Sequence, residues 1–307
     1  MPEWDAVVIG GGPAGLTAGI YLGRGNWRTL LLEKETIGGY IMNIEMIENY
    51  PGFSEGVIGA QLGSEMLNQA RKYGVQMKRG AVESVQVSSN EKWVTCSDGT
   101  TYTTSVIIFA GGSVPKKLGV PGEKELRDLG VFGCAFCDGG QFYEQVVAVC
   151  GGGDSGITEA LYLSKIASKV IVLEVMPKLN ATAILQDRLN QTVNIEIHTG
   201  MKVQKIAGED CVTGIEVVNE ETGQTETIPV DGVLVHVGLD PNTTYLEGII
   251  PLDNGKQILV NEWMESEVPG VFAVGDIRSN SPRQVSAAVG DGAAAGVAAQ
   301  RYLQKLG

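Results

Sequence analysis

Histidine, positive charge and long apolar runs are all scarce in this sequence. Only 2 of its 307 residues are histidine, and 23 lysines and arginines stand against 36 aspartates and glutamates, a net charge of -13. This balance excludes a sequence-independent nucleic-acid surface, which requires clustered cations. The Ala-rich stretch after Val289 contains Asp291 and several glycines, so no segment is apolar for long enough to span a bilayer. We therefore expect no nucleic-acid or membrane partner.

Features of secreted proteins are missing as well. The first five residues, MPEWD, lack the basic and apolar regions of a signal peptide, so we expect a cytoplasmic protein. The 5 cysteines are an odd set with a single CxxC pair, which is unlike a secreted disulfide framework.

The CxxC pair, Cys134 and Cys137, indicates redox chemistry. A structural zinc site needs about four ligands. Besides this pair the chain offers only His198 and His236, whose neighbours suggest neither a base nor a ligand, so we expect no metal centre. Thiol–disulfide exchange needs only the two sulfurs. We expect small buried roles for the remaining cysteines, which lie in or beside predicted strands: Cys96, Cys150 and Cys211.

A dinucleotide-binding pattern lies near the N-terminus. The apolar segment 5–9 is typical of a buried parallel strand and runs into Gly10-Gly11-Gly12-Pro13-Ala14-Gly15. A helical pattern follows at 14–24 and a second strand at 29–32, which Glu33 ends. Gly10 permits a tight turn, Gly12 lets the backbone approach a pyrophosphate, and Gly15 lets helix and strand pack closely. The helix N-terminus would bind phosphate, and Glu33 the ribose hydroxyls.

The same pattern recurs in the middle of the chain. A strand at 146–150 runs into a second glycine loop, followed by a helix at 156–166, a strand at 169–173 and Glu174. The glutamate follows the first glycine by 23 residues in both copies. One GxGxxG motif is weak evidence for a nucleotide site. Two copies of the same order, strand, glycine loop, helix, strand and acid, predict two nucleotide sites. Candidate residues of the second are Gly151, Gly153, Asp154, Ser155 and Glu174.

The rest of each copy predicts the domain organisation. Short alternating strands run over 81–103 and 202–229, and apolar runs that end in glycine follow at 106–112 and 233–238. A last segment, a strand at 271–276 and a helix at 287–304, has no GxGxxG and is best returned to the first domain. We expect an α/β fold of two Rossmann-like, three-layer ββα dinucleotide-binding domains, the second inserted into the first. The expected bounds are 1–115 with 243–307 for an FAD-binding domain, and 116–242 for a nicotinamide-type domain that carries the CxxC pair.

A dithiol pair beside one nucleotide site, in a chain with two, implies electron transfer between a flavin and a disulfide. Asp276 is placed to bond a flavin ribityl chain, and Arg283 and Gln284 to reach the flavin edge. The long loop 38–59 is expected to be functional, because such loops are uncommon in compact domains. The FAD candidates are Gly10, Gly12, Pro13, Ala14, Gly15, Glu33, Gly39, Asn49, Gly111, Gly275, Asp276, Arg283, Gln284 and Val285.

Together these motifs resemble the low-molecular-weight thioredoxin reductases. The two glycine loops, Cys134-Ala135-Phe136-Cys137-Asp138 and Gly275-Asp276 follow that family's order over essentially the whole chain. The resemblance implies a homodimer with non-covalent FAD and a thioredoxin or thioredoxin-like partner. It implies that Cys137 faces the flavin, that Cys134 attacks the partner disulfide, and that Asp138 protonates the leaving thiolate. A helix expected to start near Asp138 would lower the thiol pKa.

One departure from the family concerns the electron donor. After the second strand the family usually carries His-Arg-Arg, and another Arg a few residues later, whose cations bind the 2′-phosphate of NADPH. Here the sequence reads Glu174-Val175-Met176, with Asn180 near the later position. A carboxylate repels a 2′-phosphate and accepts hydrogen bonds from a free 2′-hydroxyl, so NADPH is disfavoured and NADH is the direct interpretation. Some members use no nicotinamide, and reduced ferredoxin or another flavin stays an open alternative.

We therefore expect a flavin-dependent disulfide reductase that passes electrons through FAD to Cys134 and Cys137 and on to a thioredoxin-like protein. Two other functions are compatible with the same motifs. One is a flavoprotein redox sensor, whose disulfide state alters the binding of a partner. The other is an NADH oxidase-like flavoprotein, which would consume oxygen without its cysteines.

Overall fold

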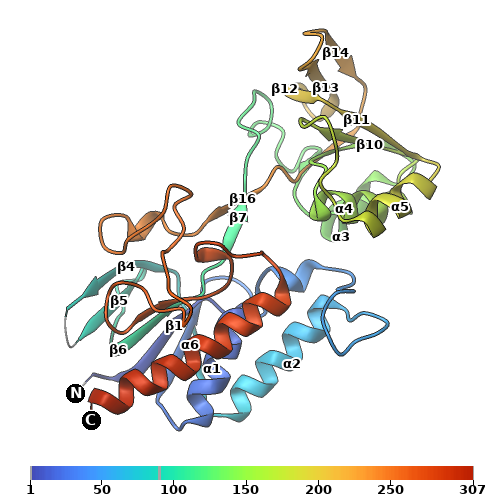
Figure 1. Cartoon of the computed structure of the whole chain (residues 1–307). Coiled ribbons are helices and arrows are strands. Elements are labelled where there is room, and N and C mark those ends of the chain that lie inside the picture. The colour runs from blue at the N-terminus through green and yellow to red at the C-terminus, as the bar shows by residue number, and fades with distance from the viewer. Residues whose placement is uncertain (1, 89–90, 307) are drawn as a thin grey trace. The chain divides into compact units, whose positions relative to one another are not determined.

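The computed structural model describes residues 2–88 and 91–306. The chain divides into two compact units, unit 1 (Met1–Val114 with Asp240–Gly307) and unit 2 (Pro115–Leu239) (Figure 1). The sequence pattern predicts the two boundaries between the domains at 115/116 and 242/243. The segments that connect the units pair with each other as strands β7 (Ser113–Pro115) and β16 (Leu239–Pro241).

A parallel sheet forms the centre of unit 1. Its strands lie in the order β3-β2-β1-β6, and β17 pairs with the other edge of β6. Side chains on both faces of the sheet are buried, which explains the uninterrupted apolar runs in the sequence. The strands are β1 (Trp4–Ile9), β2 (Thr29–Glu33), β3 (Gln76–Arg79), β6 (Thr101–Phe109) and β17 (Val271–Ala273).

Two different layers cover this sheet. Ala6 and Val8 pack on the helical layer, whose members run side by side in Figure 1, while Val7 and Ile9 pack on the opposite, strand-rich layer. The alternation follows from the period of two along a strand. The helices are α1 (Pro13–Arg24), α2 (Gly59–Lys72) and α6 (Val285–Leu306). The opposite layer contains the 3₁₀ turn η3 (Thr244–Leu246), β4 (Val82–Val87) and β5 (Lys92–Cys96), and the two strands continue the sheet antiparallel from the first part of β6.

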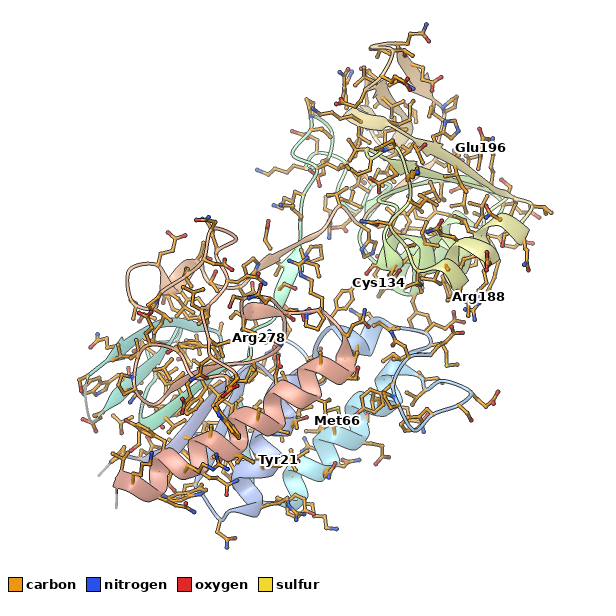
Figure 2. All side chains as sticks on the ribbon, viewed as in Figure 1. Tyr21, Met66, Cys134, Arg188, Glu196 and Arg278 are labelled. Carbon is orange, nitrogen blue, oxygen red and sulfur yellow. A yellow bond between two sulfur atoms is a disulfide. The ribbon has the colours of Figure 1, made fainter. Side chains whose placement is uncertain are left out.

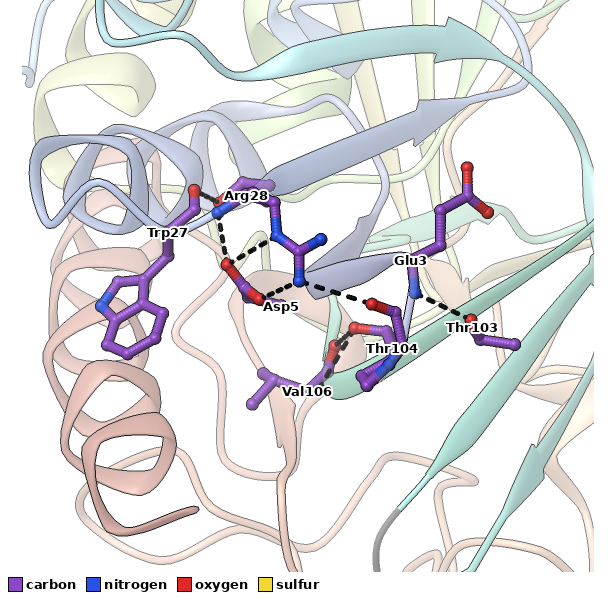
Figure 3. A network of polar contacts seen from close by, with 9 residues as sticks. Glu3, Asp5, Trp27, Arg28, Thr103, Thr104 and Val106 are labelled. Atoms are coloured by element: carbon purple, nitrogen blue, oxygen red, sulfur yellow. Dashed lines mark hydrogen bonds and ion pairs between the residues drawn. The ribbon is translucent and has the colours of Figure 1, made fainter. Parts of the chain in front are cut away.

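The amino ends of the central strands are held by polar contacts, shown in Figure 3. Asp5 accepts hydrogen bonds from the Arg28 backbone N (2.7 Å) and from its guanidinium Nη2 (2.7 Å). The Glu3 backbone N donates to Thr103 Oγ1 (2.9 Å). These contacts lie at the sheet edge opposite to the glycine loop, so they stabilise the fold and leave the carboxyl edge free for a ligand.

Unit 2 repeats the arrangement. All neighbours in its central sheet, ordered β11-β10-β9-β15-β8, are parallel. Val147 and Val149 face the helices, whereas Ala148 and Cys150 face a three-stranded antiparallel sheet. The central strands are β8 (Val131–Phe132), β9 (Val146–Cys150), β10 (Lys169–Glu174), β11 (Ile195–Thr199) and β15 (Gly232–Val235); the helices are α3 (Ala135–Asp138), α4 (Asp154–Leu163) and α5 (Ala183–Gln191), with the 3₁₀ turn η2 (Gly139–Phe142); the antiparallel strands are β12 (Met201–Gly208), β13 (Val212–Asn219) and β14 (Thr225–Ile228).

The two units differ in one strand, and this difference positions the cysteines. In the sheet of unit 2, β8 occupies the place that β17 occupies in unit 1, although β8 precedes its sheet in the chain and β17 follows its own. The turn after β17 holds Gly275 and Asp276, and the turn after β8 holds Cys134. The CxxC pair therefore lies at the carboxyl edge of a parallel sheet, where ligands bind in open α/β folds.

The structure confirms the predicted α/β architecture and corrects three details. The segment 38–59 is not entirely loop, because it contains the 3₁₀ turn η1 (Gly39–Asn43) and leads directly into α2. The helix at the CxxC pair starts at Ala135, not near Asp138, which is its last residue. Cys211 is exposed, whereas Cys96 and Cys150 are buried as expected. Over residues 2–88 and 91–306, no helix is both long and apolar enough to cross a membrane.

Candidate active site

The two glycine loops have the same atomic geometry. Gly10 and Gly151 have φ angles of 111° and 124°, a region that favours glycine. A Cβ on either would lie 2.2 to 2.3 Å from the carbonyl oxygen of Ala110 or His236. A Cβ on Gly15 would lie 2.0 Å from the Gly10 carbonyl oxygen, so close packing of helix and strand requires glycine there. The same holds in unit 2, where a Cβ on Gly156 would lie 2.1 Å from the Gly151 carbonyl oxygen.

The two glutamates also match each other bond for bond. Glu33 accepts hydrogen bonds from the backbone N of Gly11 (2.7 Å) and of Glu35 (2.8 Å). Glu174 accepts them from the backbone N of Gly152 (2.6 Å) and of Met176 (2.8 Å). Each carboxylate is thereby held against its glycine loop at the end of the second strand, where the ribose of a bound dinucleotide lies.

The first turn of α1 fits a pyrophosphate. Its N-cap residue, Gly12, has no side chain that could cap the helix, and Pro13 follows at the first helical position. The N–H groups of this turn are therefore free to bind phosphate, assisted by the helix dipole. A Cβ on Gly12 would meet only the Gly39 Cα, at 3.9 Å, so two glycine backbones border an open space. The candidates Ala14 and Gly15 are buried behind this loop.

A buried ion pair supports the turn after β17. Asp291 on α6 accepts hydrogen bonds from the Gly275 backbone N (3.0 Å) and from Arg278 Nε (2.7 Å) and Nη2 (2.9 Å). Asp276 follows in this turn, and Ser281 Oγ donates to its carboxylate (3.3 Å). Burial raises the pKa of Asp276 above its ordinary value. A carboxyl group at this position can hydrogen-bond a ligand hydroxyl.

The remaining FAD candidates lie along the same edge of unit 1. Asn49 Nδ2 donates to Gln284 Oε1 (2.9 Å), which joins the loop 38–59 to the start of α6. Gly111 follows β6, and Asn242 Nδ2 donates to its carbonyl oxygen (2.8 Å). Val285 is the first residue of α6, and Arg283, just before it, has a φ of 55°. Sequence motifs did not point to Arg278, Asp291 or Asn242, because their partners are distant in the chain.

The two cysteines of unit 2 form a disulfide on a short helix. Cys134 and Cys137 are bonded, with Cα atoms 5.4 Å apart. Figure 2 shows Cys134 beside the helices of unit 2. Cys134 is the N-cap of α3, and its Sγ accepts a hydrogen bond from the Cys137 backbone N (3.1 Å). The sulfur at a helix N-terminus is the one whose thiolate is favoured. Asp138 is exposed at the end of this helix and is not its N-cap.

The second glycine loop is bordered by side chains that the first lacks. Gly153 is the N-cap of α4, Asp154 follows, and Asp154 Oδ1 accepts from the Thr182 backbone N (2.7 Å). A Cβ on Gly152 would lie 2.6 Å from Leu179 Cδ2, and one on Gly153 would lie 3.3 Å from Asn180 Oδ1. Ser155 is exposed in the first turn of α4. Gly153, Asp154 and Ser155 thus lie at the start of a helix whose dipole favours an anion.

Two dinucleotide folds, one of which carries a disulfide at the carboxyl edge of its sheet, define a flavin-linked disulfide oxidoreductase. A family model described as pyridine nucleotide-disulphide oxidoreductase matches residues 4–292. Thioredoxin reductase of Listeria monocytogenes is 38% identical over 304 residues, which cover 99% of this chain and 95% of that protein. The chain therefore belongs to the low-molecular-weight thioredoxin reductases within the pyridine nucleotide-disulphide oxidoreductases, and it is a flavoprotein oxidoreductase.

Two further relatives support the same assignment. The crystal structure of Lactococcus lactis thioredoxin reductase, described as its FR conformation, has a TM-score of 0.96 and 36% identity, and covers 99% of this chain and 100% of that one. A bifunctional thioredoxin reductase/thioredoxin of Mycobacterium leprae is 36% identical over 300 residues, 97% of this chain and 66% of that protein.

Proposed function

We propose that the protein transfers electrons from NADH to the disulfide of a thioredoxin or thioredoxin-like protein. The observation that carries this proposal is the disulfide of Cys134 and Cys137 on a helix at the carboxyl edge of a dinucleotide-type unit. A protein of Mycobacterium leprae that joins both functions, a bifunctional thioredoxin reductase/thioredoxin, supports a thioredoxin as the partner. A homodimer, which the resemblance implies, and a cytoplasmic location both stay predictions.

We assign FAD to unit 1. Its pyrophosphate would bind at Gly12 and Pro13, its ribose hydroxyls at Glu33, and its ribityl chain at Asp276. When bound, FAD supplies two-electron transfer between a nicotinamide and a disulfide. Asn49 and Gln284, already joined by a hydrogen bond, would border the flavin ring. Gly39, Gly111, Gly275, Arg283 and Val285 complete the proposed site.

The cysteines would then act in sequence. Two electrons and two protons convert the disulfide to a dithiol, and Cys134, supported by the N-terminus of α3, attacks a sulfur of the partner disulfide. This gives a mixed disulfide and releases one partner thiolate, which Asp138 would protonate. Cys137 then attacks Cys134 Sγ, restores the internal disulfide and releases the second partner thiol. We keep Cys137 as the sulfur that faces the flavin.

Glu174 supports NADH over NADPH as the donor. The residue is only 8% exposed, and its carboxylate has two backbone partners that correspond to those of Glu33 in unit 1. A ribose with two free hydroxyls can bond this carboxylate, whereas a 2′-phosphate would be repelled by it. Between 174 and 182 the only cation is Lys178. Gly151, Gly153, Asp154 and Ser155 would hold the pyrophosphate.

The test is turnover of an oxidised thioredoxin by the flavin-containing protein with NADH as donor. Cys134→Ser should abolish turnover, by at least about 1,000-fold, and retain the flavin. Cys211→Ser is the matched control, since it removes an exposed free thiol from the same unit and should leave turnover unchanged. Wild-type protein that reduces no thioredoxin would favour the redox sensor. Fast oxygen consumption that persists in a Cys134→Ser/Cys137→Ser variant would favour an oxidase.

A further inference from the structure

A carboxylate outside the CxxC motif binds the helix that carries it. Glu159 on α4 accepts a hydrogen bond from the backbone N of Ala135, the first residue of α3 after Cys134. The Glu159 side chain is 16% exposed, so its charge is only partly solvated. A negative charge at this N–H occupies a donor that would otherwise stabilise a thiolate at Cys134.

A buried histidine lies on the other side of this carboxylate. His236 Nε2 is 3.5 Å from Glu159 Oε1, and the imidazole is 5% exposed. Within residues 2–88 and 91–306 this Nε2 atom is buried without a hydrogen-bond partner, so Glu159 is the acceptor it approaches. A buried polar nitrogen without a hydrogen-bond partner lowers the stability of the fold. We take this cost as an argument that the imidazole interacts with the carboxylate and does not only fill space in the core.

The first unit contains a counterpart to this arrangement. There, Asp291 accepts from the Gly275 backbone N at the turn after β17, and the buried Arg278 compensates its charge. In unit 2 the corresponding turn follows β8, and Glu159 is the carboxylate that binds it. In the described part of the chain, His236 is the only basic side chain paired with Glu159. The loop position that His236 occupies is held in unit 1 by Ala110, so the imidazole is not required by the fold.

We propose that Glu159 and His236 form a positioning pair that fixes the first turn of α3 and sets the thiolate content of Cys134 in the reduced protein. This inference rests on the proposed role of the cysteines in disulfide exchange. Neither residue touches the reacting sulfur; Glu159 acts through the Ala135 N–H, and His236 acts through Glu159. The His236 ring lies beside the Glu159 carboxylate, so it offsets part of that negative charge and favours the thiolate.

The redox step that exposes this effect balances without the flavin. Dithiothreitol reduces the disulfide: its two thiols form a ring disulfide, and the two electrons and two protons they release convert Cys134 and Cys137 to thiols. Loss of one proton to solvent then leaves a thiolate at Cys134. The other charged groups around the motif are Asp138 on α3, Lys165 after α4, whose ammonium lies over the Tyr162 ring, and Arg127, whose Nη2 is 3.7 Å from the Cβ position of Gly133.

The test measures the rate at which iodoacetamide alkylates Cys134 in the full-length, flavin-containing protein after reduction by dithiothreitol, from pH 5 to 9. Peptide mass spectrometry separates Cys134 from Cys137 and from the exposed Cys211. Glu159→Gln keeps an acceptor for the Ala135 N–H and removes the charge, so alkylation at pH 7 should be about three- to tenfold faster. His236→Leu removes the compensation and should make it about three- to tenfold slower.

The matched control is His198→Leu. His198 is bonded to Glu196 (2.6 Å) in the same unit, but this pair is far more exposed and lies on β11, whose Glu196 is labelled in Figure 2. His198→Leu should leave the alkylation rate of Cys134 within twofold of the wild-type rate. In the Glu159→Gln background, His236→Leu should have no further effect beyond twofold, because no charge remains to compensate.

Three results would overturn the inference: a Glu159→Gln rate within twofold of the wild type, a His236→Leu effect no larger than that of His198→Leu, or an equal His236→Leu effect in both backgrounds. If one variant does not fold, as judged by flavin absorbance and thermal melting, the other single variant decides. Because alkylation needs neither NADH nor thioredoxin, the pair can be confirmed even if the proposed turnover fails, and the reverse also holds.

Discussion

Glu33 in unit 1 and Glu174 in unit 2 are the residues at which the two units can be compared most directly. Both carboxylates lie at the end of a second strand and accept two backbone N–H groups with nearly equal distances. The sequence predicted both from their common spacing, because strand, turn and acid are local features. It did not predict Glu159, His236 or Asp291, since each acquires its role from a partner in another element.

Replacement of Glu174 tests the donor specificity. Glu174→Gln should weaken the binding of NADH about tenfold, because a charged acceptor for two ribose hydroxyls is lost. The preference for NADH over NADPH should shrink, since the repulsion of a 2′-phosphate is lost as well. The measurement is the dissociation constant of each nucleotide. Glu33→Gln is the matched control in unit 1 and should weaken FAD retention while leaving NADH binding unchanged; unchanged NADH binding in Glu174→Gln would contradict the assignment.

Lys92 is a buried cation that should make stability depend on pH. Its Nζ donates to the Ser105 carbonyl oxygen (2.9 Å) and lies 5.7 Å from the centroid of the Tyr302 ring. Burial lowers the Lys92 pKa from 10.5 to about 8. Between these values the unfolded chain binds more protons than the folded one, so this lysine raises stability as the pH rises and costs most below about pH 8.

The comparison is with Lys92→Met, which keeps the length of the stem and removes the charge. Between pH 7.5 and 9.5 the free energy of unfolding of the wild type should gain about 2 kcal/mol relative to the variant. Urea unfolding at both pH values measures it. Parallel pH dependence of the two proteins would show that Lys92 does not titrate in this range.

At the scale of elements, the strands and helices with a clear apolar pattern were predictable, and those without one were not. The strand 146–150 has the bounds expected from its apolar run, and α1 and α6 lie within two residues of their predicted ends. Helix α5 was missed because only Leu189 of its nine residues is buried, which leaves no apolar stripe to read. Helix α3 has four residues, too few for a periodic signal, and is defined by the Cys134 N-cap.

The turn between β17 and α6 depends on one ion pair. Asp291→Asn would leave the largely buried Arg278 guanidinium without its counter-charge, so the free energy of unfolding should fall by about 3 kcal/mol and FAD should dissociate more readily. Glu247→Gln breaks an exposed pair with Lys256 (3.0 Å) in the same unit and should cost less than about 1 kcal/mol. Equal urea midpoints for the two variants would argue against a structural role for Asp291.

At the scale of the molecule, the chain is one architecture used twice, and we expect that each copy can be inactivated alone. Gly15→Ala would place a methyl group 2.0 Å from the Gly10 carbonyl oxygen and should abolish FAD binding. Gly156→Ala creates the same clash in unit 2, at 2.1 Å, and should retain FAD but lose reduction by NADH. Gly140→Ala meets nothing within 4 Å and serves as the control. Flavin absorbance and NADH-dependent bleaching separate these outcomes; loss of FAD in Gly156→Ala would contradict independent sites.

The inserted unit also explains why the disulfide and the second glycine loop occur together. In its sheet, β8 delivers Cys134 to the edge at which the second glycine loop lies, as β17 delivers Gly275 in unit 1. The sequence showed the motifs side by side along the chain. That β8 takes the place of β17 is visible only in the sheet order, because a strand of two residues has no apolar pattern of its own.

The central claim, that unit 2 binds NADH and passes its electrons to a flavin in unit 1, is tested most directly by an anaerobic titration of the flavin absorbance band. NADH should bleach the band at nearly stoichiometric amounts, and NADPH should require at least tenfold more. Bleaching by dithionite but by neither nucleotide would contradict the claim and point to ferredoxin or another flavin as the donor. Equal bleaching by both nucleotides would contradict the role of Glu174.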